Sequence, residues 1–179
     1  MLGALIDHGV RDRTVLDIGA GVGAMHRDLL GAGVRSITDV DGSTAYLEVA
    51  QREAERQGHA DRITYRHGDI VDLDGAVEPA DVVILVRVLC CYPDMAALVR
   101  ASAARARRTY GVVYPRSTWW MRAAAAAYRR FLPESANVGP GFIHLEADVD
   151  AAVRGEGFQP VVDDATWYWR ITLYERAAA

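Results

Sequence analysis

The stretch Val15-Leu16-Asp17-Ile18-Gly19-Ala20-Gly21-Val22-Gly23 decides the fold of this chain of 179 residues. Its apolar start predicts a strand over 14–18, and its alternating glycines predict a tight turn where the backbone can approach a ligand closely. The next residues, 22–30, have the pattern of a helix. A strand, a glycine turn and a helix in this order are typical of α/β proteins that bind a cofactor at the turn.

The rest of the chain continues the alternation of strands and helices. Further strands are expected at 36–41, 63–67, 80–86, 109–114, 160–162 and 167–176, the last two around a turn at 163–165, and helices at 2–8, 44–57, 95–107, 118–131 and 146–155, with a Gly/Pro loop at 132–142. This order predicts one α/β domain over 1–179. Its sheet is doubly wound, mostly parallel and seven-stranded, with an antiparallel C-terminal strand and helices on both faces.

Composition excludes several classes of protein. The net charge is −4, which argues against nucleic acid as a partner. No apolar run is long enough to span a bilayer, and residues 1–9 lack the basic start of a signal peptide. The two cysteines, Cys90 and Cys91, are adjacent and are expected to be buried, free thiols in a reducing, cytoplasmic setting. No spacing of thiols or carboxylates predicts a metal site.

Two classes of cofactor compete for the glycine turn. Gly19, Gly21 and Ala24 satisfy the fingerprint of nicotinamide and flavin domains, and Asp39 and Asp41 lie near the expected ribose position. Such a match alone is weak, so the neighbouring strands have to decide between the cofactors.

Residues 15–23 also resemble the first motif of class I methyltransferases, which use S-adenosylmethionine (SAM) and release S-adenosylhomocysteine (SAH). Residues 37–43 resemble the second motif, with an acidic residue at the end of a strand, and His67-Gly68-Asp69-Ile70 resembles the third. The antiparallel C-terminal strand also fits that family. The resemblance covers nearly the whole chain and favours SAM over NAD.

The resemblance implies a SAM site at the carboxyl ends of the first four strands. Asp17 would lie near the ammonium group of SAM and Asp41 would accept hydrogen bonds from both ribose hydroxyls, because an ionised carboxylate offers two acceptor oxygens. Asp69 would accept from the adenine amino group. The full set of implied cofactor residues is Asp17, Gly19, Ala20, Gly21, Asp41, Gly42, Asp69, Ile70, Val86 and Arg87.

Structural roles remain open for several of these side chains. Asp17 and Asp69 could each stabilise a turn, Asp41 could start a helix, and Arg87 could pair with an acidic side chain. Asp39 is expected to be solvent-facing or structural rather than a ligand group.

The acceptor of the methyl group is harder to predict, because methyl transfer mainly needs alignment of the reacting atoms and exclusion of water. Residues 86–93 lack the Asn/Asp-Pro-Pro-aromatic segment of enzymes that methylate nucleobase or glutamine amino groups. The run 90–94, with Arg87 before it, resembles small bacterial methyltransferases, including the magnesium-protoporphyrin group. Five residues do not carry a substrate assignment, but they favour a small-molecule acceptor.

Candidate acceptor-pocket residues follow the later strands: Tyr92, Arg116, Trp119, Trp120 and His144. His144 is the candidate general base, because a neutral imidazole can accept a proton near pH 7, although a structural role is the alternative. Only about thirteen residues precede the first strand, so an N-terminal lid is expected to be short or missing. The helix at 118–131 or a partner subunit in a homodimer would then close the site.

These observations predict a SAM-dependent methyltransferase that acts on a small molecule, with oxygen as the expected acceptor atom. The alternatives are a NAD(P)-binding oxidoreductase and a SAM-binding module without catalytic activity.

Overall fold

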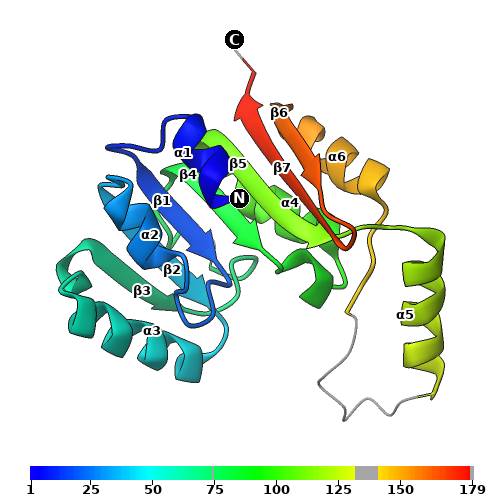
Figure 1. The fold of residues 1–179 in the computed structure, drawn as a ribbon, viewed down its shortest axis with the longest axis horizontal. Helices are drawn as coiled ribbons and strands as arrows, with labels where there is room; N and C mark the ends of the chain where they lie inside the picture. Colours follow the sequence, from blue (N-terminus) through cyan, green and yellow to red (C-terminus); the bar gives the residue numbers. More distant parts are fainter. Residues whose placement is uncertain (74, 132–140, 178–179) are drawn as a thin grey trace.

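A computed structural model describes residues 1–73, 75–131 and 141–177, and within them seven strands form a single sheet (Figure 1). The strand order is β3-β2-β1-β4-β5-β7-β6. The strands are β1 (Thr14–Ile18), β2 (Ser36–Asp41), β3 (Ile63–His67), β4 (Ala80–Val86), β5 (Ala106–Pro115), β6 (Phe158–Ala165) and β7 (Trp169–Arg176). Neighbours pair in parallel except β7, which is antiparallel to both β5 and β6. The predicted doubly wound sheet is therefore confirmed.

Helices cover both faces of this sheet, as predicted. They are α1 (Leu2–Asp7), α2 (His26–Gly31), α3 (Thr44–Gln57), α4 (Met95–Ala103), α5 (Trp119–Phe131) and α6 (Glu146–Gly155), with short 3₁₀ turns η1 (Ala60–Arg62) and η2 (Leu89–Cys91). One face packs against α1, α2 and α3, and the other packs against α4 and α6. In Figure 1, α5 stands beside the sheet, beyond the end of β5.

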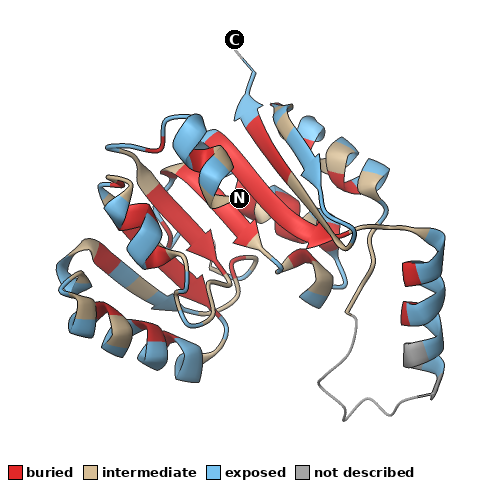
Figure 2. Ribbon diagram, viewed as in Figure 1, coloured by how far each residue is buried: buried red, intermediate tan, exposed pale blue. Residues whose placement is uncertain are grey.

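The alternation of side chains along each strand separates two hydrophobic cores. In β4, Val82 and Ile84 face the α1–α3 side, whereas Val83 and Leu85 face the α4–α6 side. The central strand is therefore buried on both faces, as its continuous apolar sequence predicts. Figure 2 shows that buried residues concentrate on β1, β4 and β5 in the middle of the sheet.

This two-sided burial predicts a large stability cost for truncation of Leu85, which is 0% exposed. We expect Leu85→Ala to lower the free energy of unfolding by about 2–5 kcal/mol, because it removes buried methyl groups and leaves a cavity. Urea denaturation measures the change. Leu145→Ala is the matched control, because Leu145 is 39% exposed and its truncation should cost much less. Equal losses in the two variants would contradict the burial that we describe for β4.

Several predicted boundaries are wrong, each for a local reason. The helix after the first glycine turn begins at His26 rather than 22, because Gly21 and Gly23 adopt positive φ and prolong the turn. Helix α4 ends at Ala103, so β5 starts earlier than predicted. Residues 163–165 belong to β6, and the turn lies at 166–168.

The structure also tests predictions about helix ends, burial and membrane spans. The helix predicted at 44–57 has these bounds in the structure: Ser43 caps α3 by accepting a hydrogen bond from the Tyr46 amide, and Gly58 ends that helix at φ 74°. Asp39 is fully buried, so it does not face solvent. The predicted loop at 132–142 lies outside the described residues over 132–140. Among described helices, no span is long and apolar enough to cross a membrane.

Candidate active site

The turn between β1 and α2 brings bare backbone to the carboxyl edge of the sheet. Gly19, Gly21 and Gly23 adopt φ of 67°, 61° and 70°, a region that favours glycine. Space is restricted as well at Gly19, where a Cβ atom would lie 2.6 Å from a methyl carbon of Val88. Glycine is therefore required there by both conformation and packing.

Two cavities meet at this turn, and Gly19 lines both of them. The first has a volume of about 510 Å³ and is lined by Asp17, Ala20, Gly21, Tyr46, Val86 and Arg87, among others. The second, of about 260 Å³, is mostly apolar and is lined by Val40, Gly42, Asp69, Ile70, Val88 and Tyr92, among others. Nine of the ten sequence-predicted cofactor residues line one cavity or the other.

The tenth residue, Asp41, lies at the end of β2 and lines neither cavity, but it is hydrogen-bonded to Gly21, which lines the first. Its Oδ2 accepts from the Gly21 amide at 3.0 Å, and its Oδ1 accepts from the Ser43 amide at 2.8 Å. Two backbone amides thus fix the carboxylate, which is 8% exposed. Asp41 therefore does more than start a helix: it ties the glycine turn to the turn after β2.

Asp69 and Tyr92 lie together at the apolar cavity. Oδ1 of Asp69 accepts a hydrogen bond from the Val71 amide at 2.9 Å, so Asp69 does stabilise its own turn. Desolvation and the hydrogen bond with Asp69 raise the pKa of Tyr92, and the phenol stays neutral. Tyr92, which we predicted for the acceptor pocket, thus lines the same cavity as Ile70.

Arg87 follows β4 with an unusual backbone conformation. Its φ is 64°, in the left-handed region, while its amide donates to the Val113 carbonyl at 2.8 Å. Non-glycine residues held this way are often found at functional sites, because the surrounding structure has to offset the strain. The guanidinium carbon lies 5.8 Å from the centre of a Trp169 ring and is not in an ion pair with a described carboxylate.

His144 contacts the backbone beside the cavities. Its Nε2 lies 3.0 Å from both the Leu89 and the Tyr92 carbonyl oxygens. Carbonyls only accept, so Nε2 carries a proton and donates it to them. If His144 accepts a proton, it therefore does so through Nδ1.

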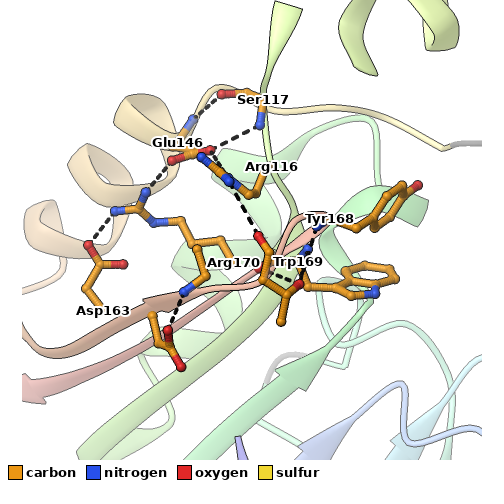
Figure 3. Close-up of polar contacts among 10 residues, drawn as sticks. Arg116, Ser117, Glu146, Asp163, Tyr168, Trp169 and Arg170 are labelled. Atoms are coloured by element: carbon orange, nitrogen blue, oxygen red, sulfur yellow. Dashed lines mark hydrogen bonds and ion pairs between the residues drawn. The ribbon is translucent and has the colours of Figure 1, made fainter. Parts of the chain in front are cut away.

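The remaining candidates lie further along this edge, where Arg116 follows β5 (Figure 3). Its Nε lies 3.9 Å from Glu146, a carboxylate that also pairs with Arg170 and accepts a hydrogen bond from the Ser117 amide at 3.2 Å. This network joins the ends of β5 and α6 to β7. Arg116 thus has a structural contact that its sequence position did not reveal.

Trp119 and Trp120 begin α5 and line neither of the two cavities. Trp119 is 81% exposed, whereas Trp120 stacks on Trp167 with ring centres 5.7 Å apart. The structure therefore brings Tyr92 and His144 near the cavities and leaves these two tryptophans apart.

The cysteines after β4 are only partly as expected. Cys90 is half-buried, and Cys91 is exposed and lines the apolar cavity, so the prediction of buried thiols is wrong for both. Burial and the adjacent Cys91 raise the pKa of Cys90 to about 12, which keeps that thiol protonated. Among the described residues, no three His, Cys, Asp or Glu side chains are grouped to hold a metal ion.

Sequence reasoning also missed cavity residues, notably Tyr46, Val88 and Cys91. Val88 has a partial signal, because it lies two residues after the end of β4. Tyr46 lies in the first turn of α3, is 52% exposed and lines the first cavity.

The strand order, the antiparallel β7 and the glycine turn at the carboxyl edge define a Rossmann-like, class I SAM-dependent methyltransferase. Residues 16–114, more than half of the chain, match the family described as "Methyltransferase domain". The chain belongs to this family, and its cofactor is SAM. No curated protein sequence matches the chain significantly.

Solved structures of methyltransferases share the fold at low sequence identity. Magnesium protoporphyrin IX methyltransferase from Synechocystis PCC 6803, with bound SAH, has a TM-score of 0.81 and 23% identity over 98% of this chain and 80% of that one. A putative sarcosine dimethylglycine methyltransferase from Galdieria sulphuraria has a TM-score of 0.79 and 13% identity, over 98% of this chain and 84% of that one. An O-methyltransferase family protein from Burkholderia thailandensis has a TM-score of 0.78 and 15% identity, over 99% of this chain and 55% of that one.

Proposed function

We propose that this methyltransferase transfers the methyl group of SAM to an oxygen atom of a small-molecule acceptor. The observation that carries the cofactor part is Asp41, whose buried carboxylate at the end of β2 is fixed by the amides of Gly21, which lines the first cavity, and of Ser43. The oxygen acceptor is supported by similar structures named for magnesium protoporphyrin IX and for O-methylation.

The chemistry of the two cavities fits the two ends of SAM. The apolar walls formed by Val40, Ile70 and Val88 suit the adenine ring, with Asp69 as acceptor for its amino group. Asp41 would accept hydrogen bonds from the ribose hydroxyls. The cavity that contains Asp17 and Arg87 suits the charged methionine end, with Asp17 beside the ammonium group.

SAM, when bound, supplies a methyl group on a positively charged sulfur. The acceptor oxygen would attack the methyl carbon in line with the carbon–sulfur bond, and the sulfur would leave as part of SAH. The residues of the chain hold and align the reactants, because orientation and exclusion of water account for much of such catalysis. Val86 and Arg87 would border the sulfur. His144 is the proposed base, and it would accept the proton of the acceptor through Nδ1 while Nε2 stays bonded to the backbone.

Ligand titration tests this assignment directly. We expect SAH to bind with a sub-millimolar Kd, measured by isothermal titration calorimetry, and NADH not to compete with it. Labelled SAM is then incubated with the chain and a small-metabolite extract, where label should enter an acceptor with an ester or ether bond. Binding of NADH alone would overturn the cofactor assignment. SAH binding without any transfer of label would instead favour a module without catalytic activity.

Three further expectations stay predictions. The chain would form a single domain whose acceptor site is closed by α5 or by a second copy in a homodimer. A cytoplasmic location is supported by the free thiols of Cys90 and Cys91. Analytical ultracentrifugation of the chain with and without SAH tests the homodimer.

A further inference from the structure

Three titratable side chains are buried together behind the glycine turn. Asp17 on β1 and Asp39 on β2 are register partners, so their side chains lie next to each other on the sheet face that α2 covers. His26, the first residue of α2, reaches down to both: its Nε2 lies 3.3 Å from Asp17 Oδ2 and 3.8 Å from Asp39 Oδ2. All three residues are at most 4% exposed.

The glycine turn is shaped around this histidine. A Cβ atom on Gly23 would lie 2.7 Å from Nδ1 of His26, so the third glycine leaves the space that the imidazole occupies. The other side of His26 borders a cavity of about 210 Å³ between α2 and α3. Asp17 borders the cofactor cavity. The three residues therefore lie between the cofactor and a second cavity through which a proton can be exchanged with solvent.

Charge in this cluster is only partly compensated. Both oxygens of Asp39 lack a hydrogen-bond partner among the described residues, although burying an unpaired carboxylate is costly. Burial, reinforced by the charges of Asp17 and Asp41, raises the pKa of Asp39 to about 7, although His26 opposes this. Burial lowers the pKa of His26, but the close carboxylate of Asp17, together with the charge of Asp39, outweighs this effect and raises that pKa.

Other ionisable groups around the cluster come from each neighbouring element. Tyr65 on β3 is the register partner of Asp39, and its own pKa is raised to about 12, so it stays neutral. Asp41 lies further along β2. Arg27 of α2 and Glu53 of α3 line the cavity of about 210 Å³ between these two helices, where Glu53 pairs with Arg56. His59 also lines that cavity. None of these groups separates His26 from the two aspartates.

We propose that His26, Asp17 and Asp39 form a proton-exchanging cluster, and that the protein releases a proton from it when the ammonium group of SAM or SAH binds beside Asp17. This inference rests on the proposed position of the methionine end. A cation that enters next to Asp17 disfavours a proton held on either His26 or Asp39, and that proton leaves to solvent. By linkage, a site that releases protons on binding binds its ligand more tightly as the pH rises.

The experiment compares wild type with the double variant His26→Gln/Asp39→Asn. Glutamine keeps a donor near Asp17 and asparagine keeps the shape of Asp39, but neither titrates. SAH binding is measured by calorimetry at pH 6, 7 and 8, in phosphate and in Tris, whose different ionisation heats reveal proton release. We expect the Kd of wild type to fall about five- to tenfold over this range, with about half a proton released at pH 7.

In the double variant the Kd should change less than about twofold between pH 6 and pH 8. Any contribution from the amino group of SAH itself is the same in both proteins and does not affect the comparison. His8→Gln is the matched control, because His8 is exposed at the C-terminal end of α1, and it should behave as wild type does. If the double variant does not fold, Asp39→Asn alone must shift the pH at which affinity changes. Equal proton release in wild type and variant would overturn the cluster, whereas absence of SAH binding to wild type at every pH would overturn the proposed function as well.

Discussion

The Asp41→Lys variant should lose detectable SAH binding, with a Kd raised by at least about 10³-fold. The substitution would remove the two charge-assisted hydrogen bonds that we propose between Asp41 and the ribose, each worth about 1.5–3 kcal/mol, and would put a cation where the hydroxyls are expected to donate. It also deprives the Gly21 and Ser43 amides of the carboxylate that fixes the glycine turn. Isothermal titration calorimetry with SAH measures the loss.

Asp61→Lys is the control for this charge reversal, because Asp61 lies in η1, before β3, and is exposed. It should bind SAH as wild type does. Asp41→Asn should fall between wild type and lysine, since one acceptor oxygen remains. Thermal unfolding of each variant separates loss of the ligand site from loss of the fold. A folded Asp41→Lys protein with unchanged affinity for SAH would refute the ribose assignment.

The parts of the site that could be predicted are those that follow directly from strand order. Asp17, Asp41 and Asp69 each stand at or just after the end of a strand, and the ends of parallel strands meet at one edge of a sheet. The resemblance to the family's motifs, placed on the predicted strand ends, therefore predicted where these side chains gather. The glycines between them indicated where the backbone turns, and both inferences depend only on local sequence.

The parts that could not be predicted depend on contacts between distant residues. The position of Asp39 is an example: its sequence context is that of any polar residue in a strand, and only the packing of α2 over β1 and β2 buries it beside His26. Arg87 is another example, because its left-handed backbone is imposed by the bond to Val113 on the neighbouring strand. Neither contact leaves a periodic signal.

The aromatic residues show the same limit. Trp119, Trp120 and Tyr92 all follow strands that lead to the carboxyl edge, so all three were predicted for one pocket. In the structure, η2 turns Tyr92 toward Asp69, whereas Trp120 begins a helix that leads to the side of the sheet and stacks on Trp167. The direction in which a chain leaves a strand depends on these turns, and strand patterns do not encode it.

Replacement of His144 should separate its catalytic role from its structural one. We expect His144→Gln to bind SAH within about threefold of wild type, because a glutamine amide can still donate to the Leu89 and Tyr92 carbonyls. Transfer of label from SAM to the acceptor should fall by about 10²–10⁴-fold, the usual contribution of a general base. The rates of both proteins are measured over a range of pH, because loss of a general base is expected to change the pH–rate profile whereas loss of a structural contact is not.

A second substitution at the same position tests the structural role of His144. His144→Asn places its amide near the position of Nδ1 and cannot reach both carbonyls, so it should weaken the contact between residue 144 and η2 and lower the thermal midpoint more than His144→Gln does. A base requires that both variants lose transfer, whereas a purely structural histidine requires that only the asparagine variant is impaired. Methyl transfer by His144→Gln within about threefold of wild type, with an unchanged pH profile, would therefore exclude His144 as the base and leave deprotonation of the acceptor to solvent.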